Sequence, residues 1–422
     1  MQRRKILKQA LSYAALGFNG SALAEDFGTS KGFPSGWPPL NQRGGQPLPW
    51  GNEDYLVSNF SGGMEPLFKH SVVHAQGVPS VFKSKPTVFK LSFAQTFADY
   101  QRKHGKTAML VVRGDTIFYE NYEFGRDAGM RFYSKSMAKG VLGILTGLAV
   151  ENGVIKSLDD TIEKYDDRLK GRPLGTVKIR HALNMSSGVN LCQVDCGQRN
   201  DFERWEEQAF AGSARMDRQK GRLRAQNTDA DKVAVEWGWG FNQPGGTRYN
   251  YQHIDPHLVS MAIRGGSKSS IAEFTEKALW QPMCAQADAV WLTDSSGVEE
   301  VGGSFCATLR DWGRIGLLIA NKGSINGKQV LRESWFNSYR EFSADENYLK
   351  PGNIPNKPRK EGYKNFLHIP YTASSWLRFG GDLGQSIYAD QKTGTVMVVL
   401  SVSNQGGQGY DYLFKEALAT LS

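Results

Sequence analysis

The sequence has little of what marks several classes of protein. Only four of its 422 residues are cysteine, and no Cys or His pair stands beside them at the spacing of zinc ligands. No Lys- or Arg-rich segment indicates a nucleic-acid partner, and no internal repeat is evident. The one apolar run near the start is too short to span a bilayer. What remains is a globular composition, 40% hydrophobic and 22% charged, long enough for one large domain or two to three smaller ones.

Residues 1–24 have the pattern of a cleavable export signal. A basic start is followed by a moderately apolar middle and by the small-residue ending of residues 22–24, which predicts cleavage after Ala24. Arg3-Arg4 resembles the twin-arginine signal, and a Sec signal with two incidental arginines is the alternative. Either export machinery would place the protein in the periplasm or outside the cell. Removal of the segment takes away four cations and no acids, so the formal net charge falls from +9 to +5.

The cysteines are relevant because an exported chain can form disulfides. Cys192 and Cys196 stand four positions apart and can close a small loop, which leaves Cys284 and Cys306 as the second pair. Four cysteines allow three connectivities, and their spacing does not choose among them. No cysteine directly follows the predicted cleavage site, which argues against a lipid anchor.

The chain after the signal divides into two parts. Residues 25–105 are rich in Gly and Pro and are expected to wrap around the main body as a loop-rich segment rather than to form a domain. Residues 106–422 are expected to form that body. Near its start, the β-rich runs 108–112 and 116–122 flank an Arg-Gly-Asp turn, which predicts a hairpin.

The end of the chain repeats this pattern. A second hairpin is predicted from residues 386–389 and 395–401, followed by a closing helix at 410–421. Strands at both ends with helices between them predict an α/β (α+β) fold. In it, one antiparallel sheet is assembled from both ends of the body and flanked by helices, with a mainly helical insertion at about residues 155–300. Further helices are expected at residues 91–103, 257–263, 271–280 and 309–320.

The stretch Phe132–Gly153 joins a reactive pair to a long apolar helix. Ser136 and Lys139 have the S-x-x-K spacing, and residues three apart on a helix share a face with Cβ atoms roughly 5–6 Å apart, so the hydroxyl and the amine can meet. The free N–H groups of the helix start lie close by. Two other matches are interpreted as structural: the S-x-x-K of residues 80–83 has no apolar helix after it, and the G-x-S-x-G of residues 28–32 lacks a buried strand before it.

A serine hydroxyl is a poor nucleophile unless a base takes its proton, and an ordinary lysine is already protonated at neutral pH. A tyrosine beside the amine is the usual complement, because the pair can share one proton. Tyr251, which follows a Pro-Gly-Gly turn, is the candidate, and an ordinary core tyrosine is the alternative. Tyr249 alternates with Tyr251 and is expected to point the other way, into the structure.

A site for acyl transfer also needs donors for the developing oxyanion. The backbone N–H of Ser136 can supply one. The second is expected from Asp382, which lies in a Gly-rich segment before a predicted strand, where Gly381 lets a substrate approach the backbone closely. A plain glycine turn is the alternative.

The long polar stretch 190–246 has no clean periodicity, and loops of this length are usually functional or disordered. Its Trp237 and Trp239 provide either packing or a wall of the substrate site. The basic run Arg215–Arg224 is either a solvated face or a sensor for a substrate carboxylate.

In order along the chain, three patterns resemble the class C serine β-lactamases and penicillin-recognising proteins. They are S-x-x-K, a Pro-Gly-Gly segment that leads to Tyr251, and G-x-x-G-Q before a strand. Within this family the chain is most similar to the 6-aminohexanoate-dimer hydrolase and esterase branch, in stretches such as IRHALNMSSGV and GQSIYADQKTGTVMVVLS. The resemblance covers about residues 105–420.

The resemblance implies a β-lactamase-like fold. It also implies an exported serine hydrolase that cleaves a small ester or amide through an acyl-enzyme, without a metal or other cofactor. By it, Ser136 corresponds to the nucleophile and Lys139 and Tyr251 to the proton-transfer pair. The N–H groups of Ser136 and Asp382 correspond to the oxyanion donors. A non-catalytic binding protein on this scaffold is the alternative from another class.

Two departures from the family pattern bear on the substrate. His253 stands where β-lactamases carry an amide Asn. The third motif, K-T-G in β-lactamases, corresponds to residues 379–381 and has no cation, while the K-T-G of residues 392–394 falls in a predicted turn. A β-lactamase or D,D-peptidase using the same site is therefore the alternative. The candidate substrate-binding residues are His253, Gly381, Gln385, Trp237 and Trp239.

Overall fold

The computed structural model describes residues 57, 60–62, 65, 69–91, 95–193, 197–199, 201–205, 209, 216–217, 222–223, 228–238, 240–371, 373, 375–406 and 410–422. The predicted export signal and the G-x-S-x-G of residues 28–32 lie outside these residues. So do Cys196, Trp239 and most of the basic run Arg215–Arg224. In the part of the chain that is described, no helix is long and apolar enough to cross a membrane.

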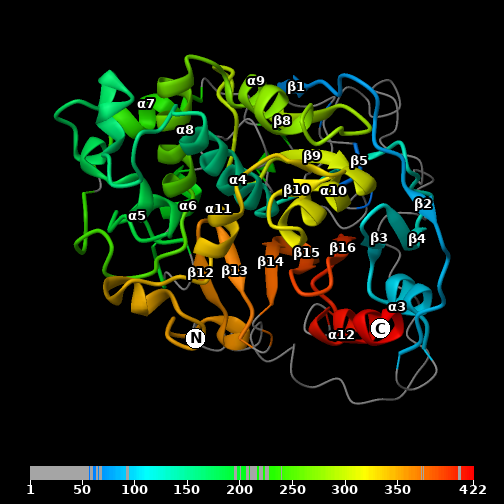
Figure 1. Ribbon diagram of the computed structural model, residues 1–422. Helices are drawn as coiled ribbons and strands as arrows, with labels where there is room; N and C mark the ends of the chain where they lie inside the picture. Colours follow the sequence, from blue (N-terminus) through cyan, green and yellow to red (C-terminus); the bar gives the residue numbers. More distant parts are fainter. Residues whose placement is uncertain are drawn as a thin grey trace.

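The centre of the molecule is an eight-stranded sheet (Figure 1), whose neighbours follow the order β12 (Gly362–Lys364), β13 (Leu367–Ile369), β14 (Trp376–Gly381), β15 (Gln385–Asp390), β16 (Thr395–Ser401), β3 (Lys106–Arg113), β4 (Thr116–Tyr122) and β2 (Lys83–Ser84). β16, from near the C-terminus, pairs antiparallel with β3, from the start of the body. The predicted sheet assembled from both ends of the chain is therefore confirmed. The short strand β2 departs from the antiparallel pattern, because it runs parallel to β4.

Both predicted hairpins are present, β3–β4 and β15–β16. The K-T-G of residues 392–394 lies in the turn of the second hairpin, as predicted. There Gly394 has φ +71°, a left-handed conformation that favours glycine, and the Asp390 carboxylate accepts a hydrogen bond from the Thr393 N–H at 3.1 Å. Turn geometry accounts for this glycine and threonine.

Helices cover both faces of the sheet because the strands alternate buried residues between them. On β3, Met109 and Val111 face a core shared with α3 (Phe97–Lys103) and α12 (Tyr410–Leu421). Leu110 and Val112 face the larger core, which contains α10 (Leu309–Ala320) and α4 (Met137–Glu151). Figure 1 shows α12 and α3 together on one side of the strands.

The helix α4 lies unusually close to β14, and a glycine permits this approach. A Cβ atom added at Gly140 would lie 2.1 Å from the Phe379 ring of β14, so any larger residue would push the helix away. Val141, Ile144 and Leu145 are fully buried on the same helix. The start of α4, where Ser136 is the N-cap, is thereby held beside the end of β14.

The remaining elements form a second, smaller sheet and the helical region. The small sheet has the order β1 (His70–Val73), β8 (Ala289–Leu292), β9 (Phe305–Thr308) and β5 (Arg131–Tyr133). Figure 1 shows most of the helical insertion as a green group on one side of α4. The other α-helices and short hairpins are α5 (Ile179–Leu183), α6 (Asp201–Trp205), α7 (Ala230–Val235), α8 (Ile254–Ser267), α9 (Ile271–Thr275), α11 (Glu333–Ser338), β6 (Met216–Asp217)–β7 (Arg222–Leu223) and β10 (Ser324–Ile325)–β11 (Lys328–Gln329).

Two expectations need correction. The helix predicted for residues 91–103 begins only at Phe97, because Thr96 and Asp99 form a reciprocal capping box there. The cysteine pairing Cys284–Cys306 is wrong, since both thiols are free, whereas Cys192 is disulfide-bonded.

Candidate active site

Ser136 lies at a sharp turn between strand β5 and helix α4. The preceding Lys135 has φ +48°, a left-handed conformation that is costly for a side chain with a Cβ atom. Ser134 fixes the turn by donating its N–H to the Phe305 carbonyl at 3.0 Å. The result is a partly exposed Ser136 hydroxyl on a rigid helix start, as the sequence predicted.

Lys139 is almost fully buried, at 1% exposure, directly behind the serine. Its Nζ atom lies 3.1 Å from Ser136 Oγ, donates a hydrogen bond to the Gly302 carbonyl, and lies 3.5 Å from His253 Nε2. An ammonium has three N–H groups, whereas a neutral amine has two and a lone pair. If the carbonyl and the imidazole take two N–H groups, the third position of the neutral amine is a lone pair aimed at Ser136.

Gln193 determines which nitrogen of His253 carries the hydrogen. His253 Nδ1 lies 2.8 Å from Gln193 Oε1, and an amide oxygen only accepts hydrogen bonds. Nδ1 is therefore the protonated nitrogen, and Nε2 presents its lone pair to Lys139. Burial, together with the positive charges of Lys139 and Lys135, lowers the pKa of His253 well below its usual 6.5, so the ring is neutral at physiological pH.

The surroundings of His253 hold the ring in place. It stacks on Phe202 with 4.8 Å between ring centroids. A Cβ atom at Gly302 would lie 2.3 Å from the imidazole, so only glycine lets this loop pass so close. The sequence predicts that His253 contacts substrate, whereas in the structure its ring contacts Lys139.

Tyr251 meets Lys139 through its ring rather than its hydroxyl. Lys139 Nζ lies 4.9 Å from the Tyr251 ring centroid. Among the described residues, no side-chain or backbone hydrogen bond occupies the Tyr251 hydroxyl. The predicted meeting of Ser136, Lys139 and Tyr251 is present, and the phenol remains available to a bound substrate or to water.

The two expected oxyanion donors lie on facing segments. A Cβ atom on Gly381, the last residue of β14, would lie 2.6 Å from the Ser134 carbonyl, so the end of β14 adjoins the turn before Ser136. Among the backbone hydrogen bonds of the described residues, none uses the N–H of Ser136 or of Asp382. The Asp382 side chain is exposed and accepts from the Leu383 N–H at 2.8 Å. Both backbone N–H groups are thus available to a ligand.

Two sequence expectations around the site need correction, and the structure decides between the two alternatives for Trp237. Gln385 is 2% exposed and uses its amide on Ser401 of β16, donating to the carbonyl and accepting from the N–H, so it stabilises the sheet rather than contacting substrate. Trp237 is buried against Trp205, which favours packing over a substrate wall. Tyr249 packs against the core, as expected, but on the same side as Tyr251, since both rings contact Tyr363.

A lysine that the sequence gave no reason to choose lies at the site. Nζ of Lys357 lies 5.9 Å from the Tyr251 ring centroid and 4.9 Å from that of Tyr363, and it donates a hydrogen bond to the Tyr249 hydroxyl at 2.5 Å. Tyr249 and Tyr251 both contact the Tyr363 ring. The segment that carries them is not a strand, so the expected alternation of their side chains does not occur.

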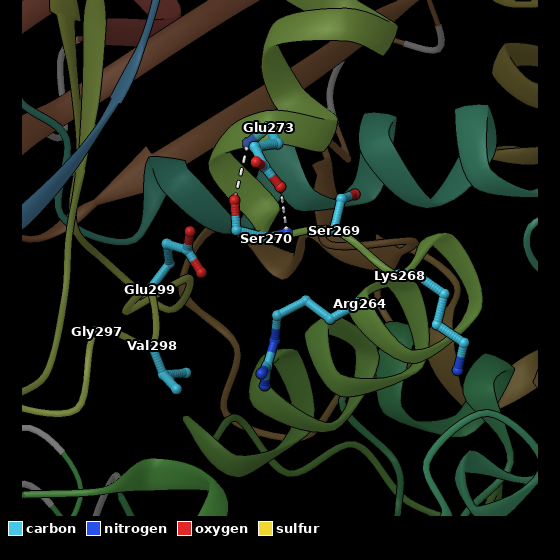
Figure 2. A pocket seen from close by; sticks show the side chains of 8 residues that line it. All are labelled: Arg264, Lys268, Ser269, Ser270, Glu273, Gly297, Val298 and Glu299. Carbon is cyan, nitrogen blue, oxygen red and sulfur yellow. Dashed lines mark hydrogen bonds between the residues drawn. The ribbon is translucent and has the colours of Figure 1, made fainter.

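The pocket in Figure 2 is a different feature. It has a volume of about 350 Å³, lies between the end of α8, the start of α9 and the loop 297–299, and is lined by Arg264, Lys268, Ser269, Ser270, Glu273, Gly297, Val298 and Glu299. Its polar groups already serve the fold: Ser270 and Glu273 cap α9 reciprocally, as the dashed lines in Figure 2 show. None of the reactive residues described above lines it. In the described part of the chain, no cluster of three His, Cys, Asp or Glu side chains could hold a metal ion.

Comparison with known proteins agrees with this geometry. The sequence pattern of the family described as Beta-lactamase matches residues 93–421. The chain is 23% identical over 336 residues to the 6-aminohexanoate-dimer hydrolase of Paenarthrobacter ureafaciens, an alignment that covers 75% of this chain and 79% of the relative.

Solved structures share the fold. A Bacillus anthracis protein assigned as a 6-aminohexanoate-dimer hydrolase superposes with a TM-score of 0.73 at 20% identity, covering 89% of this chain and 97% of that one. EstCE1, described as a hydrolase with promiscuous acyltransferase activity, superposes with a TM-score of 0.56 at 13% identity, covering 76% and 95%. At these identities the likeness establishes the architecture.

Proposed function

This chain is a serine hydrolase of the beta-lactamase family, and we propose that it cleaves an amide or ester bond through an acyl-enzyme formed on Ser136. The observation that carries the proposal is the 3.1 Å contact between Lys139 Nζ and Ser136 Oγ, beside the ring of Tyr251. The similarity to 6-aminohexanoate-dimer hydrolase supports an amide or ester as the substrate rather than another bond type.

The acylation step follows from the hydrogen bonds at Lys139. The neutral amine takes the Ser136 proton while Oγ forms a bond to the substrate carbonyl carbon. The carbonyl oxygen becomes an oxyanion between the N–H groups of Ser136 and Asp382. When the tetrahedral intermediate collapses, the bond to the leaving amine or alcohol breaks, and the proton passes from Lys139 or Tyr251 to that leaving group.

In the deacylation step, a water molecule attacks the acyl group that is bound to Ser136. As the water attacks the acyl carbon, its proton passes to the Tyr251 oxygen while the phenolic proton of Tyr251 passes to the neutral Lys139 amine, and the ester bond to Ser136 Oγ breaks. The proton returns to Ser136 through Lys139, which restores the resting site.

A β-lactamase or D,D-peptidase using the same site is the second candidate, and the family pattern favours it. The structure offers no cation on β14 at the position of the third motif, since residues 379–381 are Phe-Gly-Gly. Efficient turnover of a β-lactam is therefore not expected. The comparison is a panel of p-nitrophenyl esters, short linear amides including the 6-aminohexanoate dimer, and nitrocefin. Faster turnover of nitrocefin than of every ester and amide would select the second candidate.

We also propose that the protein is exported. The support is the sequence of residues 1–24 alone. Cell fractionation with intact-mass analysis tests it, and a mature chain that begins at Glu25 is the expected result. If a double variant with Arg3→Lys and Arg4→Lys stays in the cytoplasm, export uses the twin-arginine route. If the variant is exported as before, export uses the Sec route.

A further inference from the structure

The side chain of Lys357 ends among three tyrosine rings beside the reaction site. Its Nζ atom lies 4.3 Å from the ring centroid of Tyr249, 4.9 Å from that of Tyr363 and 5.9 Å from that of Tyr251. These rings form a cage, since Tyr249 and Tyr251 both contact Tyr363 edge-on. The Lys357 residue keeps part of its surface exposed.

The cage lies within reach of the nucleophile. The Tyr251 ring centroid is 4.9 Å from Lys139 Nζ and 5.9 Å from Lys357 Nζ, so the two nitrogens are no more than about 11 Å apart. Lys139 in turn contacts Ser136. A short chain of a few carbon atoms can therefore join a carbonyl at Ser136 to a group at Lys357.

The charges around Lys357 are unbalanced. The charge of Glu361, on the same loop, acts to raise the pKa of Lys357, but the two Glu361 oxygens accept hydrogen bonds from Arg378 at 2.7 and 2.6 Å, and the carboxylate lies 3.2 Å from His368. Arg359 lies 3.9 Å from Glu361 and 3.9 Å from Asp411. Among the described residues, no carboxylate lies within 4.0 Å of Lys357 Nζ, whose hydrogen-bond partner is a phenol.

An ammonium in this position is costly without an anion. Removing a charge from water is unfavourable unless the charge is paired, and burial lowers the pKa of Lys357 to about 7. The loop also holds the lysine in place at the expense of strain, because Asn356, Arg359 and Lys360 around it have φ between +52° and +59°. A strained loop that presents an unpaired cation to a cage is expected to bind an anion.

We propose that Lys357 is a specificity-determining residue that binds a carboxylate of the substrate, so that the enzyme prefers esters or amides with a carboxylate a few carbon atoms from the scissile bond. This inference rests on the proposed hydrolase function and deepens it by naming a substrate class. The cation comes from the loop before β12 rather than from β14, which is why the strand motif alone did not predict it. Two N–H groups of the ammonium remain for the carboxylate after the bond to Tyr249.

The test compares matched esters that differ only in a carboxylate. One pair carries it on the acyl side, mono-4-nitrophenyl glutarate against 4-nitrophenyl pentanoate. The other pair carries it on the leaving group, 4-acetoxybenzoate against 4-acetoxybenzamide. In the wild type, we expect kcat/KM to favour the acid in at least one pair, which also assigns the side of the site. A charge-assisted hydrogen bond corresponds to a preference of about 10- to 100-fold.

Variants separate this role from a structural one. Lys357→Met removes the charge and keeps the length, and it should abolish the preference chiefly by raising KM for the acid, while Lys357→Arg should retain most of it. Lys360→Met is the matched control, because Lys360 is exposed on the same loop and its ammonium lies over Tyr371. It should leave the ratio of the two esters as in the wild type.

Three outcomes would overturn the proposal. They are a wild type that does not prefer the acid in either pair, a Lys357→Met variant that keeps the preference, and a Lys357→Met variant that loses activity on acid and neutral ester by the same factor while its thermal unfolding is unchanged. Failure of the hydrolase function is a separate result, seen as no hydrolysis of any ester and no covalent labelling of Ser136.

Discussion

Nε2 of His253 lies 3.5 Å from Nζ of Lys139, and Nδ1 of the same ring lies 2.8 Å from Gln193 Oε1. These contacts form a chain that ends at Ser136, whose Oγ is 3.1 Å from the lysine. The glutamine fixes the tautomer, the imidazole accepts one N–H of Lys139, and the remaining position of the amine faces the serine. His253 is therefore a positioning residue for the proposed base.

His253→Ala should lower kcat for a p-nitrophenyl ester about 10- to 100-fold, because the Lys139 amine loses an acceptor that orients it. His253→Asn should recover most of the rate, since an amide oxygen can accept the same hydrogen bond. The measurement is kcat and KM as a function of pH for the wild type and both variants. A merely structural histidine would leave the profile's inflection where it is, and it would not be rescued by asparagine.

Stability should fall as the solution is acidified below pH 6.5. Burial lowers the pKa of four imidazoles, to about 4 for His104 and about 3 for His368, and below 6.5 for His181 and His253. The unfolded chain therefore binds more protons than the folded one between these values, and the free energy of unfolding rises with pH there. Burial raises the pKa of Asp255 to about 8, so its carboxyl stays protonated in the fold in this range and acts in the opposite sense. All four imidazoles keep some exposure, and we expect a net loss on the order of 1–3 kcal/mol between pH 6.5 and 5.

Urea unfolding at a series of pH values measures this loss. The His253→Asn variant is the control, because it should reduce the number of protons taken up on unfolding. A free energy of unfolding that stays constant from pH 6.5 to 5 would contradict the assigned direction of these pKa values.

Gly140→Ala should destabilise the protein by about 1–3 kcal/mol, because the new Cβ atom would lie 2.1 Å from the Phe379 ring. The same shift would separate Ser136 from the end of β14, so kcat should fall as well. Gly238→Ala is the matched control, since nothing lies within 4 Å of a Cβ atom there. Thermal unfolding and ester hydrolysis of both variants decide the matter, and equal effects at the two positions would refute the close approach.

Two thiols should react after denaturation without reductant, those of Cys284 and Cys306. In the native protein Cys306 should react slowly, because it is 2% exposed and burial raises the pKa of its thiol. Cys284 is partly exposed and should react first. Alkylation followed by peptide mass mapping counts the labels. Absence of label at both positions would restore the pairing that the structure rejects.

Much of the fold follows from local patterns in the sequence. The S-x-x-K pair is predictable because residues three apart on a helix meet whatever surrounds them. The two hairpins follow from β-rich runs around short turns. Their pairing with each other in one sheet follows because the β-rich runs lie at the two ends of the body, with helices between them.

The parts of the site that come from loops were not predictable in this way. Gln193 lies 60 positions from His253, and Lys357 lies 108 positions from Tyr249, so no periodicity connects these contacting residues. Tyr249 was placed wrongly because alternation holds only for a strand. Gln385 was placed wrongly because its partner, Ser401, is known only once β15 and β16 are paired.

The most direct measurement of the central claim is intact-mass analysis after treatment with a fluorophosphonate, on the wild type and on Ser136→Ala. We expect one added phosphonyl group on the wild type, located at Ser136, and none on the variant, together with a loss of ester hydrolysis of about 10³-fold or more in the variant. Labelling at another serine, or a Ser136→Ala variant that hydrolyses esters at the wild-type rate, would contradict it.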